Sequence, residues 1–393
     1  CFIFLFFNLI GAQDLSLDLG ELIEGKYDPN RLEAIRSMRN GEYYTVLEED
    51  KTLNTNSLVS YAYSNTLERK VIIDSNRFPE KNKFSGYIFS NDEQKILLET
   101  LIDNIYRRSK QAIYWIYDIK TNSLEKLLDQ KVQEPLFSPD GLKVAYVYRR
   151  NLFTKNLELD IVKQITYDGD YQTINGITDW VYEEEFGFVR AFDWSQDSNQ
   201  IVYMRFDESN VPIFSMDVYG NQTYPFPYMF RYPKAGEENS KIELIIYNTS
   251  SQTKETIDFE NETPYYIPRI QFIGGRHSLI IQTLNRHQNK LKLWRWNTKK
   301  KNLQLLLTEI DEAYVSINDD LKFIEDDRFL WTSEKDGYKH IYHFDKDGKL
   351  INQVTQGDWE VTTIYNYNPK SKEIYFQSVE GSSIERGIYA IDI

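Results

Sequence analysis

One paired-strand unit recurs along the chain and constrains its fold more than any other feature. Each copy has an apolar or aromatic pair, a turn rich in Ser, Asp, Asn or Gly, an alternating apolar strand and a second aromatic strand ending near Asp or Asn. The turn positions Asp92, Asp140 and Asp197 are spaced at intervals the size of one propeller blade, somewhat longer than common propeller repeats. Copies of the unit lie at residues 87–118, 136–155, 192–217, 270–297, 323–345 and 365–392.

The density of these strands, with turn signals between them and hardly any amphipathic helical window, predicts an all-β fold. The 29 Tyr, 22 Phe and 7 Trp also suit strands better than helices. Radial repetition is the expected arrangement, because each small sheet then buries both faces against its neighbours. A β-sandwich would not repeat the same unit so often. We therefore expect a β-propeller, whose period is interrupted at residues 212–259 by an insertion before a strand at residues 241–248.

Two short segments precede the repeats. Residues 1–10 are almost wholly apolar, and Gly11, Ala12 and Gln13 follow them, which resembles the apolar core and cleavage region of a secretory signal peptide. The alternative is a short buried strand. We assign residues 1–12 to a signal-peptide remnant, 13–41 to a lead-in with a helix around 29–38, and 42–393 to the propeller, whose last blades need not be complete. Export to a periplasmic or extracellular location, or association with the cell envelope, follows from this assignment.

Charge and composition exclude several other functions. The net charge of −14 repels a phosphate backbone, so nucleic acid is excluded as a partner. A single Cys cannot form paired-Cys metal spacing, and His340 and His343 would point to opposite faces of an alternating strand. There is no Gly-rich phosphate loop and no Gly-x-Ser-x-Gly nucleophile elbow, the nearest segment being residues 381–383. We expect no metal, no cofactor and no catalytic residue in this chain.

An acidic segment at residues 179–186, Asp-Trp-Val-Tyr-Glu-Glu-Glu-Phe, sets three carboxylates among large apolar side chains. Adjacent like charges repel in a low-dielectric setting, so a compensating cation is expected. A protonated primary amine has three donors in a compact head, and two converging carboxylates would satisfy two of them. The alternative is a solvated acidic turn with no ligand.

Residues 176–185, Gly-Ile-Thr-Asp-Trp-Val-Tyr-Glu-Glu-Glu, resemble the double-Glu motif of the dipeptidyl peptidase IV branch of the prolyl oligopeptidase family. The resemblance extends over nearly the whole chain from about residue 41. It implies a propeller of about eight four-stranded blades. In the family an α/β-hydrolase domain with a Ser-Asp-His triad follows the propeller, and we expect that domain to be absent from this chain. Other similar stretches are residues 138–141, 144–147, 232–236, 334–341 and 357–361.

The resemblance also implies roles for particular residues. Glu184 and Glu185 match the pair that binds the free α-ammonium of the substrate, and Glu183 is the leading, less critical carboxylate. Arg107 matches an arginine that contacts a substrate carbonyl; alternatively it is a surface residue, or a register error transfers its role to Arg108. A late-blade aromatic residue of the family's site has no clean match here.

A carboxylate pair held at one distance from a nucleophile would measure the substrate from its amino end, so that cleavage follows the second residue. The resemblance thus implies the substrate-recognition propeller of an exported dipeptidyl peptidase that releases X-Pro or X-Ala dipeptides, with this chain inactive alone. The expected partners are a peptide with a free N-terminus, the hydrolase domain of the parent chain and a second copy in a homodimer. The alternatives are a non-catalytic binding or scaffold propeller and a propeller glycosidase, whose carboxylates must lie about 5–10 Å apart.

Overall fold

The computed structural model describes residues 17–29, 34–79, 82–259, 262–273 and 278–393. The chain divides into two compact units, residues 1–77 and 78–393, which are described separately. The expected signal-peptide remnant at residues 1–12 lies outside the described residues.

The first unit contains one antiparallel sheet in the order β1-β2-β3-β4. The expected helix around residues 29–38 is wrong in its described part, because residues 36–37 form strand β1 and residues 30–33 lie outside the description. Pairing of Arg36 with Thr45 on β2 satisfies this backbone and overrides the local helical preference. The elements are α1 (Leu19–Ile23), β1 (Arg36–Ser37), β2 (Tyr43–Asp50), β3 (Thr55–Ala62), β4 (Arg69–Asp74) and η1 (Ser75–Arg77).

The second unit opens with two sheets whose four strands pair antiparallel in chain order, followed by a five-stranded sheet. The first comprises β5 (Gly86–Phe89), β6 (Lys95–Asn104), β7 (Lys110–Asp118) and β8 (Ser123–Lys126). The second comprises β9 (Gln133–Phe137), β10 (Lys143–Tyr148), β11 (Asn151–Asn156) and β12 (Ile161–Gln164). The third comprises β13 (Thr173–Asn175), β14 (Phe192–Trp194), β15 (Gln200–Asp207), β18 (Lys241–Asn248) and β19 (Lys254–Thr256).

The insertion predicted at residues 212–259 contains a separate hairpin, β16 (Ile213–Val218) and β17 (Phe226–Arg231), which interrupts the third sheet. The strand predicted at residues 241–248 is β18, which pairs with β15 along its whole length. As the interruption of the repeat predicted, the hairpin lies in the chain between β15 and β18, two paired strands of the third sheet.

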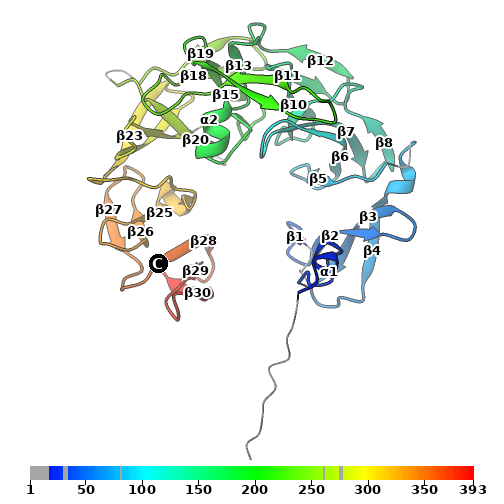
Figure 1. Ribbon diagram of the computed structural model, residues 1–393. Helices are drawn as coiled ribbons and strands as arrows, with labels where there is room; N and C mark the ends of the chain where they lie inside the picture. The colour runs from blue at the N-terminus through cyan, green and yellow to red at the C-terminus, as the bar shows by residue number, and fades with distance from the viewer. Residues whose placement is uncertain (1–16, 30–33, 80–81, 260–261, 274–277) are drawn as a thin grey trace, which may run out of the picture. The chain divides into compact units, whose positions relative to one another are not determined.

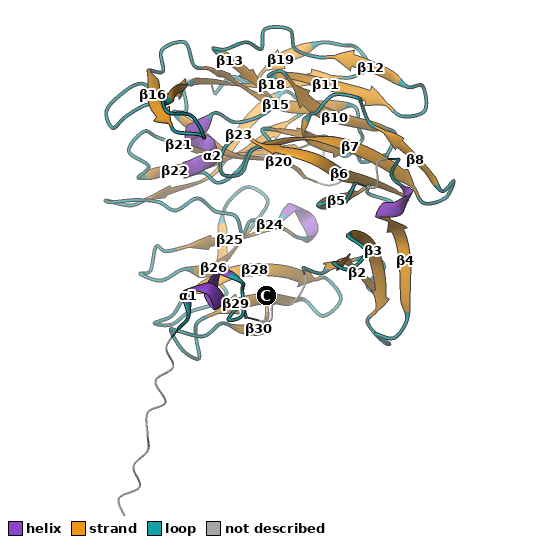
Figure 2. Ribbon diagram, turned by 45° about the vertical axis from the view of Figure 1, so that its right-hand side comes forward, coloured by secondary structure: helices purple, strands orange, loops and turns teal. Residues whose placement is uncertain are grey.

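Three sheets complete the second unit, again in chain order. They are β20 (Tyr266–Ile273), β21 (Ser278–Leu284), β22 (Lys290–Asn297) and β23 (Asn302–Ile310); β24 (Lys322–Phe323), β25 (Phe329–Ser333), β26 (His340–Phe344) and β27 (Leu350–Gln353), with η2 (Glu325–Asp327); and β28 (Val361–Asn368), β29 (Glu373–Ser378) and β30 (Gly387–Asp392). Figure 2 shows how little helix accompanies these strands. The all-β prediction is confirmed, and successive antiparallel meanders of this kind are the blades of a β-propeller.

The turn residues of the first three copies of the sequence repeat form the same hydrogen bonds. A serine hydroxyl donates to the aspartate two residues later and accepts the backbone N–H five residues later, which closes the turn between two strands. The serine-to-aspartate distances are 2.6 Å for Ser90–Asp92, 2.5 Å for Ser138–Asp140 and 2.6 Å for Ser195–Asp197.

Within the second unit, neighbouring sheets share polar bonds as well as a buried apolar core. The Asp140 amide donates to Ser198 Oγ at 3.0 Å, joining the second sheet to the third. The Phe272 amide donates to Asp193 Oδ2 at 2.9 Å, joining the third sheet to β20. The helix α2 (Trp180–Glu185) lies beside β20 in both views (Figures 1 and 2), where the Ile267 amide donates to the hydroxyl of Tyr182 at 2.8 Å.

Candidate functional site

The acidic segment folds as the short helix α2, and Asp179 determines where the helix begins. Asp179 is the N-cap, and its Oδ1 accepts the Tyr182 N–H at 2.9 Å. Its Oδ2 accepts the hydroxyl of Ser240 at 2.5 Å, which ties the start of α2 to the residue before β18. Burial raises the pKa of Asp179, and the two hydrogen bonds oppose that shift by favouring the carboxylate.

The three consecutive glutamates occupy three different environments. Successive helical residues are rotated by about 100°, so only one of the three faces the interior. Glu183 is 1% exposed, the Glu184 side chain is 17% exposed, and Glu185 is exposed. The expected repulsion among three packed carboxylates is therefore avoided by their directions.

Glu183 connects α2 to the loop between β6 and β7. Its Oε1 accepts the backbone N–H groups of Arg108 and Ser109, each at 2.7 Å. Two main-chain donors thus satisfy the most buried carboxylate of the segment. The resemblance ranked Glu183 as the less critical glutamate; in the structure it is the residue that positions the loop bearing Arg107.

Arg107 and Glu184, both predicted as site residues, are brought together. Arg107 Nε lies 3.4 Å from Glu184 Oε2, and the arginine side chain is 74% exposed. Arg108, the alternative to Arg107, also lies near α2, because a Cβ on Gly187 would be 3.8 Å from its Cζ. Both candidate arginines therefore flank the acidic helix, and Arg107 is the one in ion-pair contact with it.

Glu185, the third predicted site residue, follows Glu184 at the exposed end of α2. Burial raises the pKa of Tyr266, and the negative charge of Glu185 adds to that shift. The Tyr266 hydroxyl accepts from Asn239 Nδ2 at 2.7 Å. Glu185 is thus close enough to influence Tyr266 electrostatically while its carboxylate is open to solvent.

A cavity of about 410 Å³ lies next to α2, bounded partly by Trp180, Glu183 and Tyr106. Its lining also contains the ion pair of Arg150 and Glu208, whose Nη1 and Oε2 are 3.0 Å apart. Burial raises the pKa of Glu208 to about 7, although Arg150 opposes the shift. Sequence reasoning missed this pair, because neither residue belongs to a distinctive motif and their contact depends on tertiary folding.

Metal ligation has no support in the described residues, where no group of three or more His, Cys, Asp or Glu could hold an ion. Both ring nitrogens of His340 have protein partners, Thr355 Oγ1 at 3.0 Å and the Gly357 carbonyl at 2.9 Å. In the part of the chain that the structure describes, no helix has the length and apolar character needed to cross a membrane.

Consecutive antiparallel sheets in chain order, one of them carrying a short acidic helix beside Arg107, define the class of β-propellers. The chain belongs to a more specific class, the dipeptidyl peptidase IV N-terminal region family, whose model matches residues 90–393.

Named relatives and solved structures agree with this membership. The chain is 30% identical over 391 residues to a "Probable dipeptidyl-aminopeptidase B" of Podospora anserina, covering 90% of this chain and 42% of the relative. It is 28% identical over 375 residues to a "Dipeptidyl peptidase 4" of Trichophyton tonsurans, covering 91% of this chain and 47% of the relative. The crystal structure of Porphyromonas gingivalis dipeptidyl peptidase 4 superposes with a TM-score of 0.87 and 36% identity, covering 96% of this chain and 54% of that one. The chain thus spans about half the length of these relatives.

Proposed function

We propose that this chain is the substrate-recognition propeller of an exported dipeptidyl peptidase, and that Glu184, Glu185 and Arg107 bind the amino-terminal end of the peptide. The observation that carries the proposal is the contact between Glu184 and Arg107 across two segments far apart in sequence. Membership of a family whose relatives are named as dipeptidyl peptidases supports it.

The site offers negative charge to the ammonium group of a peptide and a cationic donor to one of its carbonyl groups. The carboxylates of Glu184 and Glu185 would accept two of the three ammonium N–H donors, and their negative charge would offset desolvation of the cation. The guanidinium of Arg107, which already pairs with Glu184, would donate to a carbonyl of the same peptide. Two opposite charges at a fixed separation fix both the position and the direction of the bound chain.

The reaction itself would belong to an α/β-hydrolase domain of the parent protein. Its Ser-His-Asp triad would attack the carbonyl of the second residue and release an X-Pro or X-Ala dipeptide. The contribution of the propeller would be positioning, since holding the amino terminus brings one particular peptide bond to the nucleophile. The length of the held segment would therefore determine which bond is cleaved.

Export to a periplasmic or extracellular location is part of the proposal, and the apolar run at residues 1–10 supports it. The mature protein should begin near Gln13. Mass spectrometry of the protein isolated from its natural source measures this end. A mature chain that retains residues 1–10 would contradict export by this route.

Homodimerisation is proposed from the family resemblance together with the surface of the β16–β17 hairpin. Ile213 and Met229 lie on the same face of that hairpin and are 60% and 65% exposed, which suits contact with a second copy. Light scattering of the full protein should give twice the chain mass, and Ile213→Glu with Met229→Glu should give the monomer. A monomeric wild type would contradict the dimer.

The experiment that tests the function uses the full protein containing this chain and an X-Pro amide substrate with a free or an acetylated amine. Charge-assisted hydrogen bonds contribute roughly 1.5–3 kcal/mol each, so Glu184→Gln or Glu185→Gln should lower kcat/KM for the free amine at least about tenfold. Acetylation should reduce kcat/KM far more in the wild type than in the double variant. A scaffold propeller predicts no hydrolysis, and an equal acetylation penalty in both proteins would exclude these residues as the ammonium site.

A further inference from the structure

Arg269, on β20, holds the C-terminal end of α2. Its Nη1 donates to the carbonyl oxygen of Phe186 at 2.9 Å and to that of Pro268 at 2.7 Å. Phe186 is the C-cap of α2 and directly follows Glu185. The last carbonyls of a helix lack partners within the helix and carry partial negative charge, so a guanidinium is well suited to this position.

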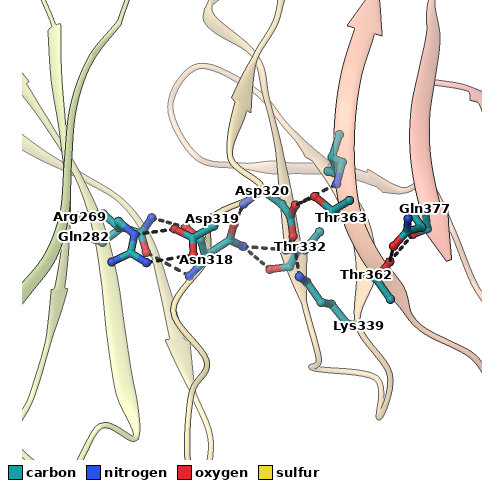
Figure 3. Close-up of polar contacts among 11 residues, drawn as sticks. Arg269, Gln282, Asn318, Asp319, Asp320, Thr332, Lys339, Thr362, Thr363 and Gln377 are labelled. Carbon is teal, nitrogen blue, oxygen red and sulfur yellow. Dashed lines mark hydrogen bonds and ion pairs between the residues drawn. The ribbon is translucent and has the colours of Figure 1, made fainter. Parts of the chain in front are cut away.

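Asp319 fixes the orientation of that guanidinium. Nε and Nη2 of Arg269 contact Asp319 Oδ1 at 2.5 Å and Oδ2 at 3.0 Å (Figure 3). Two parallel bonds hold the plane of the guanidinium, which directs the remaining nitrogen toward the Phe186 carbonyl. The side chains are 27% and 66% exposed, and an exposed ion pair contributes little stability. The main consequence of the pair is therefore geometric.

The backbone that carries Asp319 is itself held on both sides, as Figure 3 shows. The backbone carbonyl of Asn318 accepts from the side chain of Gln282, and the backbone N–H of Asn318 donates to the same side chain. The side-chain Nδ2 of Asn318 donates to the Thr332 carbonyl at 2.6 Å. On the other side, Asp320 accepts from Lys339 Nζ at 2.5 Å. Asn318 and Asp320 are 5% and 4% exposed. The exposed carboxylate of Asp319 is therefore carried by a backbone segment whose two neighbouring residues are buried and hydrogen-bonded.

We propose that Arg269 and Asp319 are positioning residues of the amino-terminus site, and this inference rests on the function proposed above. Glu183 anchors α2 to the loop of Arg107, and Arg269 anchors the end of the same helix to the Asp319 segment. A helix of six residues has too few internal bonds to hold its own position. The two anchors together keep the carboxylates of α2 at a fixed distance from Arg107.

The test uses the full protein with Arg269→Lys and, separately, Asp319→Asn. Lysine keeps the charge but cannot form the bidentate contact while also bonding the Phe186 carbonyl. The quantity measured is the ratio of kcat/KM for the free-amine substrate to that for its N-acetylated form. Displacing the carboxylates should lower this ratio about tenfold in both variants, whereas a purely structural loss would lower both rates equally and leave the ratio unchanged.

Arg205→Lys is the matched control. Arg205 lies on β15, is 26% exposed, and is held by two carboxylates, Asp168 at 2.7 Å and Glu243 at 3.0 Å. The substitution Arg205→Lys weakens a comparable set of arginine–carboxylate contacts elsewhere in the second unit. The selectivity ratio should stay at the wild-type value in this variant.

The outcomes separate this inference from the proposed function. A wild type that does not favour the free amine contradicts the proposed function itself. A selective wild type whose selectivity survives Arg269→Lys and Asp319→Asn overturns the positioning role alone. In the Glu184→Gln background, Arg269→Lys should lower the ratio little further, because the two changes disrupt the same contact; full additivity would also overturn the positioning role.

Discussion

At the scale of single residues, Glu183, Glu184 and Glu185 are alike in sequence and distinct in the structure. Glu183 is buried and accepts two backbone N–H groups, whereas Glu184 pairs with the side chain of Arg107. Glu183 therefore anchors the loop that carries Arg107, whereas the side chains of Glu184 and Glu185 are partly or fully exposed. The same division predicts different consequences for stability and for binding.

Glu183→Ala should destabilise the fold. The substitution leaves the backbone N–H groups of Arg108 and Ser109 without their acceptor, and hydrogen bonds to a charged group contribute about 1.5–3 kcal/mol. Urea denaturation should show a loss of unfolding free energy of that size. Glu185→Ala, at an exposed position of the same helix, should change it by less than about 0.5 kcal/mol. Equal losses in the two variants would contradict the anchoring role.

Glu208 should make stability depend on pH. Burial raises its pKa from the ordinary value of 4.5 to about 7 in the folded protein. Between these values the folded state binds more protons than the unfolded state, so the unfolding free energy falls as the pH rises. The cost of the buried charge is absent below about pH 4.5 and complete above about pH 7, and a shift of this size corresponds to roughly 3 kcal/mol.

Glu208→Gln removes that titration. Relative to wild type, the variant should gain up to roughly 3 kcal/mol in stability between pH 5 and pH 8. Thermal or urea unfolding at several pH values measures the difference. Two parallel pH profiles would show that Glu208 titrates normally in the folded protein.

At the scale of elements, α2 illustrates what the sequence could and could not predict. The family resemblance assigned the acidic segment and Arg107 to one substrate site, and Asp179 is a recognisable N-cap residue. The anchoring of Glu183 was not predictable, because its partners are main-chain amides about 75 positions away in the sequence. For the same reason no pattern indicated Arg269, whose partner is a carbonyl oxygen.

Asp179→Ala should weaken α2 at its beginning. It removes the acceptor for the Tyr182 N–H and for the Ser240 hydroxyl, and loss of an N-cap costs about 1–2 kcal/mol. Asp179→Asn keeps an acceptor for Tyr182 and supplies an N–H for Ser240, so it should retain most of the stability. Unfolding free energies together with hydrogen exchange of residues 180–185 measure the effect. An Asn variant as unstable as the Ala variant would refute the capping role.

At the scale of the whole molecule, the repeat predicted the fold class because its turns have a local cause. Each Ser-x-Asp turn closes through bonds between residues at most five apart, so it leaves a periodic trace in the sequence. Hydrogen bonds between sheets leave no such pattern in the sequence, because they join a side chain to the backbone of a distant segment. The bond from the Phe272 amide to Asp193 is an example. The failed helix near residue 36 has the same origin, because β1 exists through its pairing with β2.

Asp320 joins the sheet that ends at β27 to the one that begins at β28. Its Oδ1 accepts from the Thr363 hydroxyl at 2.9 Å and the Ile364 amide at 2.8 Å, while its Oδ2 accepts from Lys339. Repeat proteins derive their stability from such neighbour contacts, so losing one link can uncouple the units on its two sides. The link is buried, which makes its loss more costly than loss of a surface pair.

Asp320→Ala should therefore destabilise the chain by about 3 kcal/mol and separate the unfolding of β28–β30 from that of the preceding sheets. Hydrogen exchange measured by mass spectrometry should show faster exchange in residues 361–392 and unchanged exchange in β20–β23. Asp319→Ala is the matched control, because it removes the adjacent but exposed carboxylate and leaves the bonds to Thr363 and Ile364 in place. If the two variants affect residues 361–392 equally, or if the Asp320 variant unfolds in a single unaltered transition, the coupling between these sheets resides in their apolar packing and not in Asp320.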